Sequence, residues 1–411
     1  MKPSEYSTAT PTQLASKNGS WLSRRYLDQV LKRLPHLEYG TLSLYMPSGE
    51  ELQFGEAKPG EPRAEVRLKS LKPISRLLRS GLIGWAESYM DGEWDSPDIV
   101  ALVRWALGNE HAMDEVMQGH PILNFFNRLI HLARSNTRKG SRKNIAYHYD
   151  LGNDFYKLWL DPTMTYSSAL YDGTDDLSEA QLTKYRRICQ MLEIKPGETV
   201  LEIGCGWGGF AEVAAAEYGA QVTGITLSKE QLKYAQERIA SAGLSERADF
   251  HLIDYRDVSG QYDHIVSIEM FEAVGQEHWP TYFSQVKSLL KPGASAVLQV
   301  ITIANERFDA YASAADFIQK YIFPGGMLPS PEKLEQQVSA ADLKLDEPLF
   351  FGRDYARTLA QWRHTFLAQW PRIQTQGFDE RFRRMWLYYL TYCEGGFTEG
   401  SIDVGLFKIT R

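Results

Sequence analysis

The sequence predicts a doubly wound α/β fold in the C-terminal part of the chain, joined to a smaller, mostly helical N-terminal domain. Three observations lead to this prediction. Strand-like and helix-like segments alternate beyond about residue 180, a glycine-rich turn follows the first of these strands, and 411 residues exceed the usual size of one domain. We expect the N-terminal domain at residues 1–127, a basic linker at 128–146 and the α/β domain at 147–411.

The elements of the α/β domain follow from local patterns of apolar residues. Short apolar runs bounded by turn residues predict strands at 199–204, 221–226, 249–253, 262–269, 295–302 and 403–409. Helical periodicity predicts helices at 208–218, 229–242 and 279–290, and aromatic-rich helical insertions at 307–321 and 357–396. A sheet of this kind binds its ligand beyond the carboxyl ends of its strands.

The N-terminal part combines helical patterns with a few strands. An amphipathic helix is predicted at 21–34, a hairpin at 40–45 and 51–54, a short strand at 66–68 and helical structure from 74 to 130. Residues 1–144 hold 20 Lys and Arg against 16 Asp and Glu, whereas the rest of the chain is strongly acidic and the total charge is −7. The basic stretch at 128–143 is typical of a solvated linker or of a segment that lies against anionic lipid headgroups.

The cysteines and the hydropathy of the chain indicate the cellular compartment in which the protein is expected. Cys189, Cys205 and Cys393 form an odd set without metal-type spacing, so we expect a reduced, cytoplasmic protein without a metal site. The N-terminus lacks the apolar segment of a signal peptide, and no uncharged apolar run approaches ~20 residues. We therefore expect any contact with lipid to come from one side of a membrane.

The segment V-L-E-I-G-C-G-W-G-G-F at 200–210 is the most informative part of the chain. Gly204, Gly206 and Gly208 follow a G-x-G-x-G pattern, which departs from the dinucleotide spacing, and Glu202 precedes the first glycine by two positions. This turn resembles the S-adenosylmethionine loop of class I methyltransferases. In that fold the acid or its neighbours bind the amino-acid end of the ligand.

The ends of the next two strands offer further candidate cofactor contacts. Where a dinucleotide fold places an acid for the ribose, this chain has Thr226, Ser228 and Gln231, and Ser228 also fits a helix N-cap. After the third strand, Tyr255 and Arg256 are candidates for contact with an adenine ring. A nicotinamide-linked oxidoreductase remains a rival, although the glycine spacing and the missing acid speak against it.

The chain resembles the family of cyclopropane-fatty-acyl-phospholipid synthases and mycolic acid cyclopropane synthases. The resemblance rests on seven ordered motifs, together with a weaker one at 87–94. These are H-Y-D-L-G-N-D-F-Y (148–156), L-D-P-T-M-T-Y-S (160–167), L-E-I-G-C-G-W-G-G, T-L-S-K-E-Q, D-Y-R-D, S-I-E-M-F-E-A-V-G (267–275) and K-Y-I-F-P-G-G-M-L-P (320–329).

The resemblance implies a Rossmann-like class I methyltransferase that methylates double bonds of unsaturated acyl chains in membrane phospholipids. It implies S-adenosyl-L-methionine as cofactor, bicarbonate as a bound general base, and a lipid-associating N-terminal domain. It also implies a protein peripheral to the inner face of the membrane, which acts on the phospholipid bilayer and forms a homodimer; we expect no nucleic acid partner. By motif matching, Tyr149, Tyr166, Ser167 and Trp207 join the candidate cofactor residues.

Carried over residue by residue, the resemblance places Glu272, Tyr355 and Ile301 in the pocket for the anion. Two further pocket positions depart from the family: Ser168 replaces a cysteine and Gln299 replaces a histidine. A third departure is Ala273, which replaces the histidine of F-E-H-V-G. Serine and glutamine can hydrogen-bond an anion, but glutamine cannot carry a proton.

These departures leave the product open. The first expectation is a cyclopropane fatty acid. If the anion binds more weakly, or if the carbocation loses its proton by a different route, the product would be a methyl-branched or methylene chain. The cofactor and the substrate class would be the same. The second alternative is a catalytically silent relative that only binds lipid.

Overall fold

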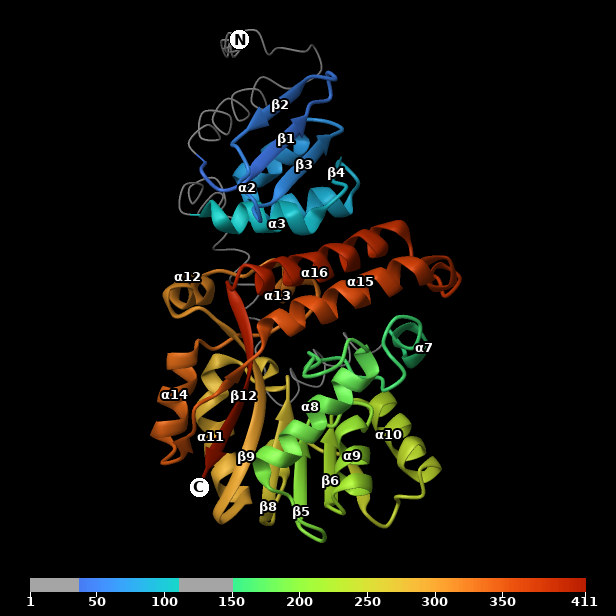
Figure 1. The fold of residues 1–411 in the computed structure, drawn as a ribbon, viewed down its shortest axis with the longest axis vertical. Helices are drawn as coiled ribbons and strands as arrows, with labels where there is room; N and C mark the ends of the chain where they lie inside the picture. The colour runs from blue at the N-terminus through green and yellow to red at the C-terminus, as the bar shows by residue number, and fades with distance from the viewer. Residues whose placement is uncertain (1–36, 111–150) are drawn as a thin grey trace. The chain divides into compact units, whose positions relative to one another are not determined.

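The computed structural model describes residues 37–110 and 151–411. The chain divides into two compact units, Met1–Asn124 and Phe125–Arg411 (Figure 1). The predicted helix at 21–34, the basic linker at 128–146 and the candidate residue Tyr149 lie outside the described residues, as does the part of the predicted helical region beyond residue 110.

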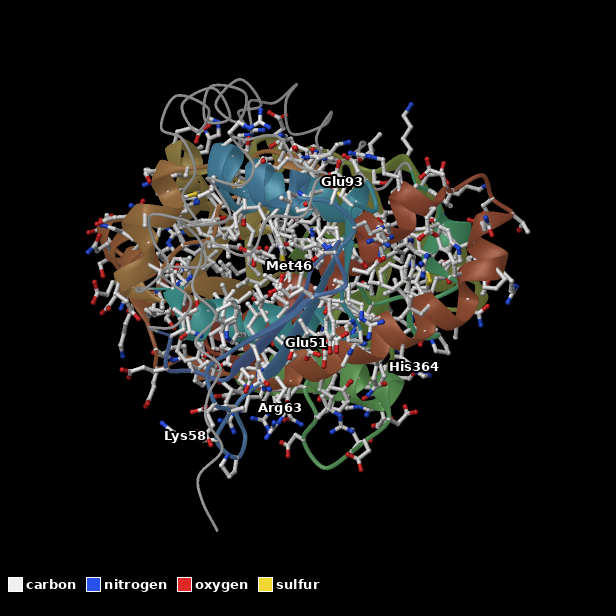
Figure 2. The ribbon with its side chains drawn as sticks, turned by 90° about the horizontal axis from the view of Figure 1, so that it is seen from above. Met46, Glu51, Lys58, Arg63, Glu93 and His364 are labelled. Atoms are coloured by element: carbon white, nitrogen blue, oxygen red, sulfur yellow. The ribbon has the colours of Figure 1, made fainter. Side chains whose placement is uncertain are left out.

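A four-stranded sheet forms the centre of the N-terminal unit. Its order is β2 (Glu51–Phe54), β1 (Thr41–Tyr45), β3 (Arg63–Leu68) and β4 (Trp94–Asp95), and β3 runs parallel to β1. The hairpin that the sequence predicts joins β1 to β2. Figure 2 labels Met46, which follows β1, and Glu51, which begins β2. At the turn between them the N–H of Met46 donates to the carbonyl of Glu50 at 2.8 Å. The sheet is larger than this hairpin because β3 and β4 extend it.

Two described helices accompany this sheet. Helix α2 (Lys72–Met90) is interrupted at Gly81, where φ is 58°, and α3 (Ile99–Gly108) begins at Asp98, whose side chain accepts from the N–H of Ala101. Arg76 of α2 forms ion pairs with acids of the motif at 87–94, among them Asp91 at 2.7 Å. The acids of that motif therefore have a local structural role.

The larger unit is built on an eight-stranded sheet. Seven strands follow the order β10-β12-β9-β8-β5-β6-β7, and β11 (Leu349–Phe350) pairs with β12. The strands of this order are β5 (Thr199–Ile203), β6 (Gln221–Thr226), β7 (Ala248–Leu252), β8 (Tyr262–Ile268), β9 (Leu290–Ile303), β10 (Lys344–Leu345) and β12 (Ile402–Thr410). Strands β5 to β9 are parallel and β12 is antiparallel to β9, which confirms the predicted α/β class.

Helices cover both faces of this sheet (Figure 1). Helices α8, α9 and α10 pack together on one face, and α11 packs with α14 on the other. The helices of the unit are α7 (Asn153–Tyr156), α8 (Leu177–Leu192), α9 (Gly209–Glu217), α10 (Lys229–Ser241), α11 (Trp279–Leu289), α12 (Phe308–Ser313), α13 (Phe317–Tyr321), α14 (Pro331–Ala340), α15 (Gly352–Gln374) and α16 (Glu380–Thr398). The α15–α16 pair forms the predicted aromatic-rich insertion before β12.

Strand β9 begins five residues earlier than the sequence predicts. The segment L-L-K-P-G looks like a helix stop, yet Leu290 already pairs with Tyr262 of β8. The next pairing joins Ser295 to His264, so the residues between form an irregularity of the kind that a β-bulge produces. The predicted start at Ser295 therefore coincides with the return of regular pairing.

Candidate active site

A glycine turn lies at the carboxyl end of β5, directly before α9. Gly204, Gly206 and Gly208 have φ values of 86°, 50° and 82°, in the left-handed region that favours glycine. A Cβ atom at position 204 would lie 2.9 Å from the Cγ of Met270, so this position also requires the absence of a side chain. The turn therefore brings bare backbone to the edge of the sheet where a ligand of this fold binds.

Beneath the turn lies a buried set of charges. Glu202 of β5 is 2 % exposed, and within the described part of the chain its Oε2 atom has no hydrogen-bond partner. Burial raises the pKa of Glu202 well above its usual range, while Arg238 and Lys184 oppose the rise. An orphaned buried carboxyl oxygen at the start of the glycine turn fits a donor from the amino-acid end of S-adenosylmethionine.

The polar residues at the end of β6 form a compact network. The Oγ1 atom of Thr226 donates to Oε1 of Gln231 at 2.8 Å and accepts from the N–H of Ser228 at 3.1 Å. Ser228 is the N-cap of α10 and accepts from the N–H of Gln231. Since Oε1 of Gln231 already accepts from Thr226, its amide nitrogen is the group that can donate to a ribose hydroxyl.

At the end of the third strand an arginine is paired with a buried carboxylate. Arg256 donates to both carboxylate oxygens of Asp254, at 2.8 and 2.7 Å, and Asp254 is 3 % exposed. The carboxylate of Asp254 thus holds Arg256 in place. The ring of Tyr255 packs at 5.3 Å from the ring of Tyr282. The proposed contact of Tyr255 and Arg256 with adenine stays a prediction from the motif.

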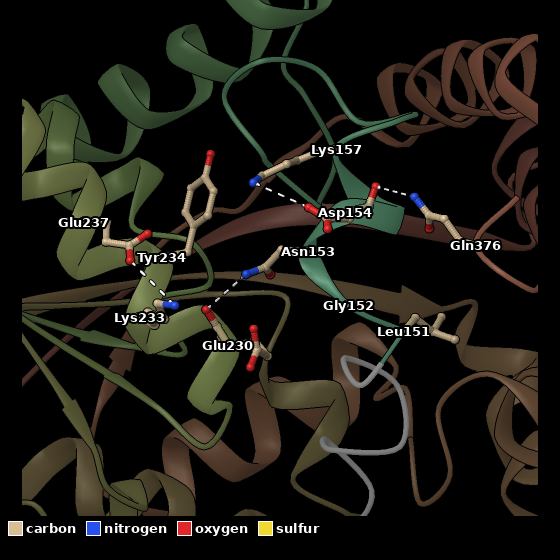
Figure 3. Close-up of a pocket in the computed structure, with 10 residues that line it drawn as sticks. All are labelled: Leu151, Gly152, Asn153, Asp154, Lys157, Glu230, Lys233, Tyr234, Glu237 and Gln376. Carbon is tan, nitrogen blue, oxygen red and sulfur yellow. Dashed lines mark hydrogen bonds and ion pairs between the residues drawn. The ribbon is translucent and has the colours of Figure 1, made fainter. Parts of the chain in front are cut away.

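Trp207 connects the glycine turn to the segment before it. Its indole Nε1 donates to Oδ1 of Asn153 at 2.7 Å, and its ring lies 5.2 Å from that of Tyr156. Asn153 also donates to the carbonyl of Glu230 in α10. Figure 3 shows the adjoining polar groove of about 460 Å³, which α7, α10 and Gln376 line. This groove lies beside the candidate cofactor residues Trp207 and Gln231.

Glu272 lies in a short turn after β8, next to the end of β9. Its Oε1 accepts from the N–H of Ile301 at 2.6 Å, and among the described residues its Oε2 has no partner. Burial and the neighbouring charge of Glu269 raise the pKa of Glu272 to about 8. The two predicted pocket residues Glu272 and Ile301 therefore meet, and Glu272 is mainly protonated at neutral pH.

A second carboxyl, which was not among the predicted site residues, is the centre of the site. Glu269 follows the last residue of β8. Its Oε1 accepts from the N–H of Ser168 at 2.8 Å and from Nε2 of Gln299 at 2.7 Å, and its Oε2 accepts from the hydroxyl of Tyr355 at 2.7 Å. Three predicted pocket residues thus converge on one protein carboxylate.

These contacts do not fit the expected anion pocket. The hydroxyl of Ser168 donates to the carbonyl of Ala169 at 3.0 Å, so Ser168 offers its backbone N–H in place of its side chain. That N–H, the amide of Gln299 and the hydroxyl of Tyr355 all donate to Glu269. The donors that the family resemblance assigns to bicarbonate are already engaged.

Lys184 of α8 is the second site residue that was not predicted. It is fully buried, and its Nζ donates to Oγ of the candidate cofactor residue Ser167 at 2.6 Å. Burial lowers the pKa of Lys184 to about 7, while Glu269, Asp161 and Glu202 oppose that change. Two acids three positions apart in S-I-E-M-F-E were a visible signal for Glu269. Lys184 lies in an amphipathic helix, where a lysine is expected on the exposed face, and no signal marked it.

An aromatic cluster adjoins the carboxylates. The ring of Tyr355 lies 6.1 Å from that of Trp362, which lies 5.3 Å from that of Tyr166. The hydroxyl of Tyr166 hydrogen-bonds that of Tyr389 at 2.7 Å, and Trp159 packs edge-on against the group. Trp362 is fully buried, so the proton-accepting groups border an apolar, aromatic region.

The fold and the glycine turn define a class I methyltransferase that depends on S-adenosylmethionine. The chain belongs to the mycolic acid cyclopropane synthetase family, which it matches over residues 136–407. It is 39% identical over 356 residues to the tuberculostearic acid methyltransferase UfaA1 of Mycobacterium tuberculosis, covering 82% of this chain and 80% of that protein. It is 38% identical over 362 residues to the cyclopropane-fatty-acyl-phospholipid synthase of Escherichia coli K12, with 87% and 90% covered.

Solved structures support the same assignment. The mycolic acid cyclopropane synthase CmaA1 complexed with SAH and CTAB is 33% identical and superposes with a TM-score of 0.63, covering 66% of this chain and 98% of that one. A coclaurine N-methyltransferase bound to SAH shares the fold at a TM-score of 0.62 with 18% identity. Both structures confirm the predicted fold class, and the CmaA1 complex supports the cofactor S-adenosylmethionine.

The described residues contain neither a membrane span nor a metal cluster. Within residues 37–110 and 151–411, no helix combines the length and apolar character needed to cross a bilayer. The same residues contain no group of three or more His, Cys, Asp or Glu side chains placed to hold a metal ion.

Proposed function

We propose that this enzyme methylates a double bond in an acyl chain of a membrane phospholipid and closes the product to a cyclopropane. One observation carries this proposal: the carboxylate of Glu269, which accepts from the hydroxyl of Tyr355, borders an aromatic region at the sheet edge that holds the glycine turn. An alkene is a weak nucleophile, and its methylation leaves a carbocation. Aromatic faces stabilise such a cation, the exclusion of water protects it, and a nearby base removes a proton.

The cofactor supplies an electrophilic methyl group on a sulfonium sulfur. In this proposal Glu202 and the turn at Gly204–Gly208 bind its amino-acid end, Ser167 and Tyr166 border that site, and Gln231 donates to the ribose. Trp207 closes the turn from the side, tied to Asn153. Tyr149 lies outside the described residues, and its proposed cofactor contact stays a prediction from the motif.

An open-chain product is the second candidate, and a specific observation favours it. Gln299 and Ser168 depart from the family pattern at the pocket, and the tuberculostearic acid methyltransferase is as similar to this chain as the cyclopropane synthase is. Both products share the same methyl transfer and differ in the later fate of the carbocation. The active-site chemistry up to the carbocation is therefore common to the two candidates.

The enzyme reaches its substrate from the surface of a membrane in this proposal, as a peripheral protein on the inner face. The acyl chains named for the relatives support a lipid substrate. The homodimer and the absence of a nucleic acid partner stay predictions, and sedimentation at several protein concentrations with and without vesicles tests the first of them.

A labelling experiment tests the function. The purified chain is incubated with palmitoyl-oleoyl phosphatidylglycerol vesicles and methyl-deuterated S-adenosylmethionine, and the fatty esters are analysed by mass spectrometry. We expect the transferred carbon to appear as a labelled ring CD2 group in the oleoyl chain, with loss of the alkene. A new double bond between a chain carbon and the labelled carbon identifies the open-chain methylene product. Dipalmitoyl vesicles serve as the control. Vesicle binding without incorporation of label would identify a silent relative.

A further inference from the structure

Glu269 adopts a backbone conformation that is costly for a residue with a side chain. Its φ is 48°, in the left-handed region, and it directly follows β8. Its N–H donates to the carbonyl of Gln299 at 2.8 Å, which fixes this conformation against the neighbouring strand. Backbone strain at such a position is maintained by the surrounding structure and is concentrated at functional sites.

The carboxylate of Glu269 is bound as a separate anion would be bound. It accepts from a backbone N–H (Ser168), a side-chain amide (Gln299) and a phenol (Tyr355), all within 2.8 Å. Hydrogen bonds to an ionised carboxylate are the stronger kind. An exogenous bicarbonate would have to displace a carboxylate that is covalently part of the chain and already holds every one of these donors.

We propose that the carboxylate of Glu269 takes the place of the bicarbonate ion and is itself the base of the reaction, so that the enzyme needs no dissolved bicarbonate. This inference rests on the proposed function and names the residue that completes it. The structure gives Glu269 the ligands of the expected anion, and it gives Glu272 the N–H of Ile301.

The proton transfer balances without any further reagent. In the acyl chain, the alkene π pair forms a bond to the transferred methyl carbon, the carbon–sulfur bond breaks toward sulfur, and one chain carbon becomes a cation. A C–H bond of the new methyl group then breaks, and its proton forms an O–H bond with Glu269. The released electron pair bonds to the cationic carbon and closes the ring. If a hydride shift first moves the cation to the methylated carbon, the same loss of a proton gives a methylene group.

The charges around Glu269 are consistent with a base. Burial raises the pKa of Glu269, which improves it as a proton acceptor, while Lys184 and the three donors oppose the rise and favour the ionised form. Glu272 has a single donor and, with Glu269 beside it, keeps its proton at neutral pH. Two neighbouring carboxyls with different environments thus separate into one ionised and one neutral group.

The test compares turnover in bicarbonate-free and bicarbonate-supplemented buffer. We expect the wild-type rate on palmitoyl-oleoyl phosphatidylglycerol to be equal in argon-purged, CO2-stripped buffer and after addition of bicarbonate. Glu269→Gln keeps the size of the side chain but is a very poor proton acceptor, so its rate should fall about 100-fold in both buffers. Glu269→Gly removes the carboxylate and the backbone strain, so its rate should be low without bicarbonate. Added bicarbonate can then bind the donors that Glu269 occupied, and the rate should rise several-fold.

Glu193→Gly is the matched control. Glu193 ends α8 with φ of 54°, and it is exposed. The same substitution in the same backbone conformation, away from the site, should leave the rate unchanged in both buffers. The proposal is wrong if removal of bicarbonate slows the wild type, if Glu269→Gln turns over normally, or if bicarbonate fails to raise the rate of Glu269→Gly.

A binding measurement separates this proposal from the function on which it rests. Carbon-13-labelled bicarbonate is titrated into the wild type and into Glu269→Gly, each with S-adenosylhomocysteine bound, and followed by NMR. We expect saturable binding by Glu269→Gly alone, and binding by the wild type would contradict the proposal. If no lipid is methylated, the proposed function fails, and this titration still decides whether Glu269 fills the anion site.

Discussion

Glu269 and Gln299 are joined twice: the Gln299 amide donates to Oε1 of Glu269 at 2.7 Å, and the N–H of Glu269 donates to the carbonyl of Gln299 at 2.8 Å. The sheet produces this arrangement, because Ile268 of β8 lies opposite Gln299 of β9 in the parallel pairing. Glutamine suits the position since it donates a hydrogen bond to the carboxylate without competing for the proton.

Gln299→Leu removes the amide that donates to Glu269. A hydrogen bond to a charged group contributes about 1.5–3 kcal/mol, so we expect turnover to fall roughly 10–100-fold. Loss of a donor to the ionised form raises the pKa of Glu269, so the acid limb of the rate profile should move to higher pH. Measurement of kcat from pH 5 to 9 checks this. Gln361→Leu removes an amide that donates to Tyr171 and should leave the limb in place.

Glu272→Gln should change how stability depends on pH. The folded-state pKa of about 8 lies above the ordinary value of 4.5, so the folded state holds a proton that the unfolded state releases between these values. Wild-type stability therefore falls as pH rises from about 4.5 to 8. The neutral glutamine does not titrate, so this loss of stability is absent from the variant. By pH 8 its free energy of unfolding should exceed that of the wild type by up to about 4 kcal/mol.

Urea unfolding at pH 5 and pH 8 measures this difference for Glu272→Gln. The advantage of the variant should be small at pH 5 and large at pH 8; a constant difference would show that Glu272 is ionised in the folded state. Turnover should drop while affinity for S-adenosylhomocysteine persists, since Glu272 lies in the proton-handling part of the site. Unchanged turnover would remove Glu272 from that part.

Gly204→Ala should disrupt the cofactor site. The new Cβ would lie 2.9 Å from the Cγ of Met270, in a backbone conformation with φ of 86°. We expect the affinity for S-adenosylhomocysteine, measured by calorimetry, to fall at least tenfold, about 1.4 kcal/mol, because the turn must shift. Gly377→Ala has a comparable φ of 97° with open space around the Cβ, and it should leave this affinity intact.

Asn153→Ala should weaken cofactor binding more mildly. Asn153 joins the indole of Trp207 to the carbonyl of Glu230, and its loss frees one side of the glycine turn. We expect the dissociation constant for S-adenosylhomocysteine to rise several-fold, in line with one lost hydrogen bond of about 1 kcal/mol. The neighbouring Asp154 has a largely exposed side chain, and Asp154→Ala is the control. Equal affinities in the two variants would exclude the proposed role of Asn153.

Local patterns were sufficient to predict most of the larger unit. The strand at Gln221–Thr226 is observed with the predicted ends, and the glycine turn lies where the spacing placed it. The predicted start of β9 was wrong because Pro292 and Gly293 indicate a break, whereas Leu290 already pairs with Tyr262 and Gly293 and Ala294 exchange backbone hydrogen bonds with Arg411. Pairing partners of this kind are distant in the sequence and leave no local signal.

The structure brings several predicted site residues together, and their connections could not be predicted from the sequence. Ser168, Gln299 and Tyr355 were identified, yet their common partner Glu269 was not, because motif matching gave the role of the acid to Glu272. Lys184 was missed since a buried lysine on an otherwise amphipathic helix is visible only once the charges beneath the glycine turn are placed. Hydrogen bonds between side chains far apart in the sequence decide such roles.

The left-handed backbone at position 269 also bears on how such a site could arise. Glycine adopts that conformation without a steric penalty. A glycine codon of the GGA or GGG type becomes a glutamate codon by one base change. A mutation at this position would leave the course of the main chain in place and add a carboxylate within reach of the donors of Ser168, Gln299 and Tyr355. A single nucleotide change thus separates an enzyme that takes its base from solution from one whose base is a side chain of its own.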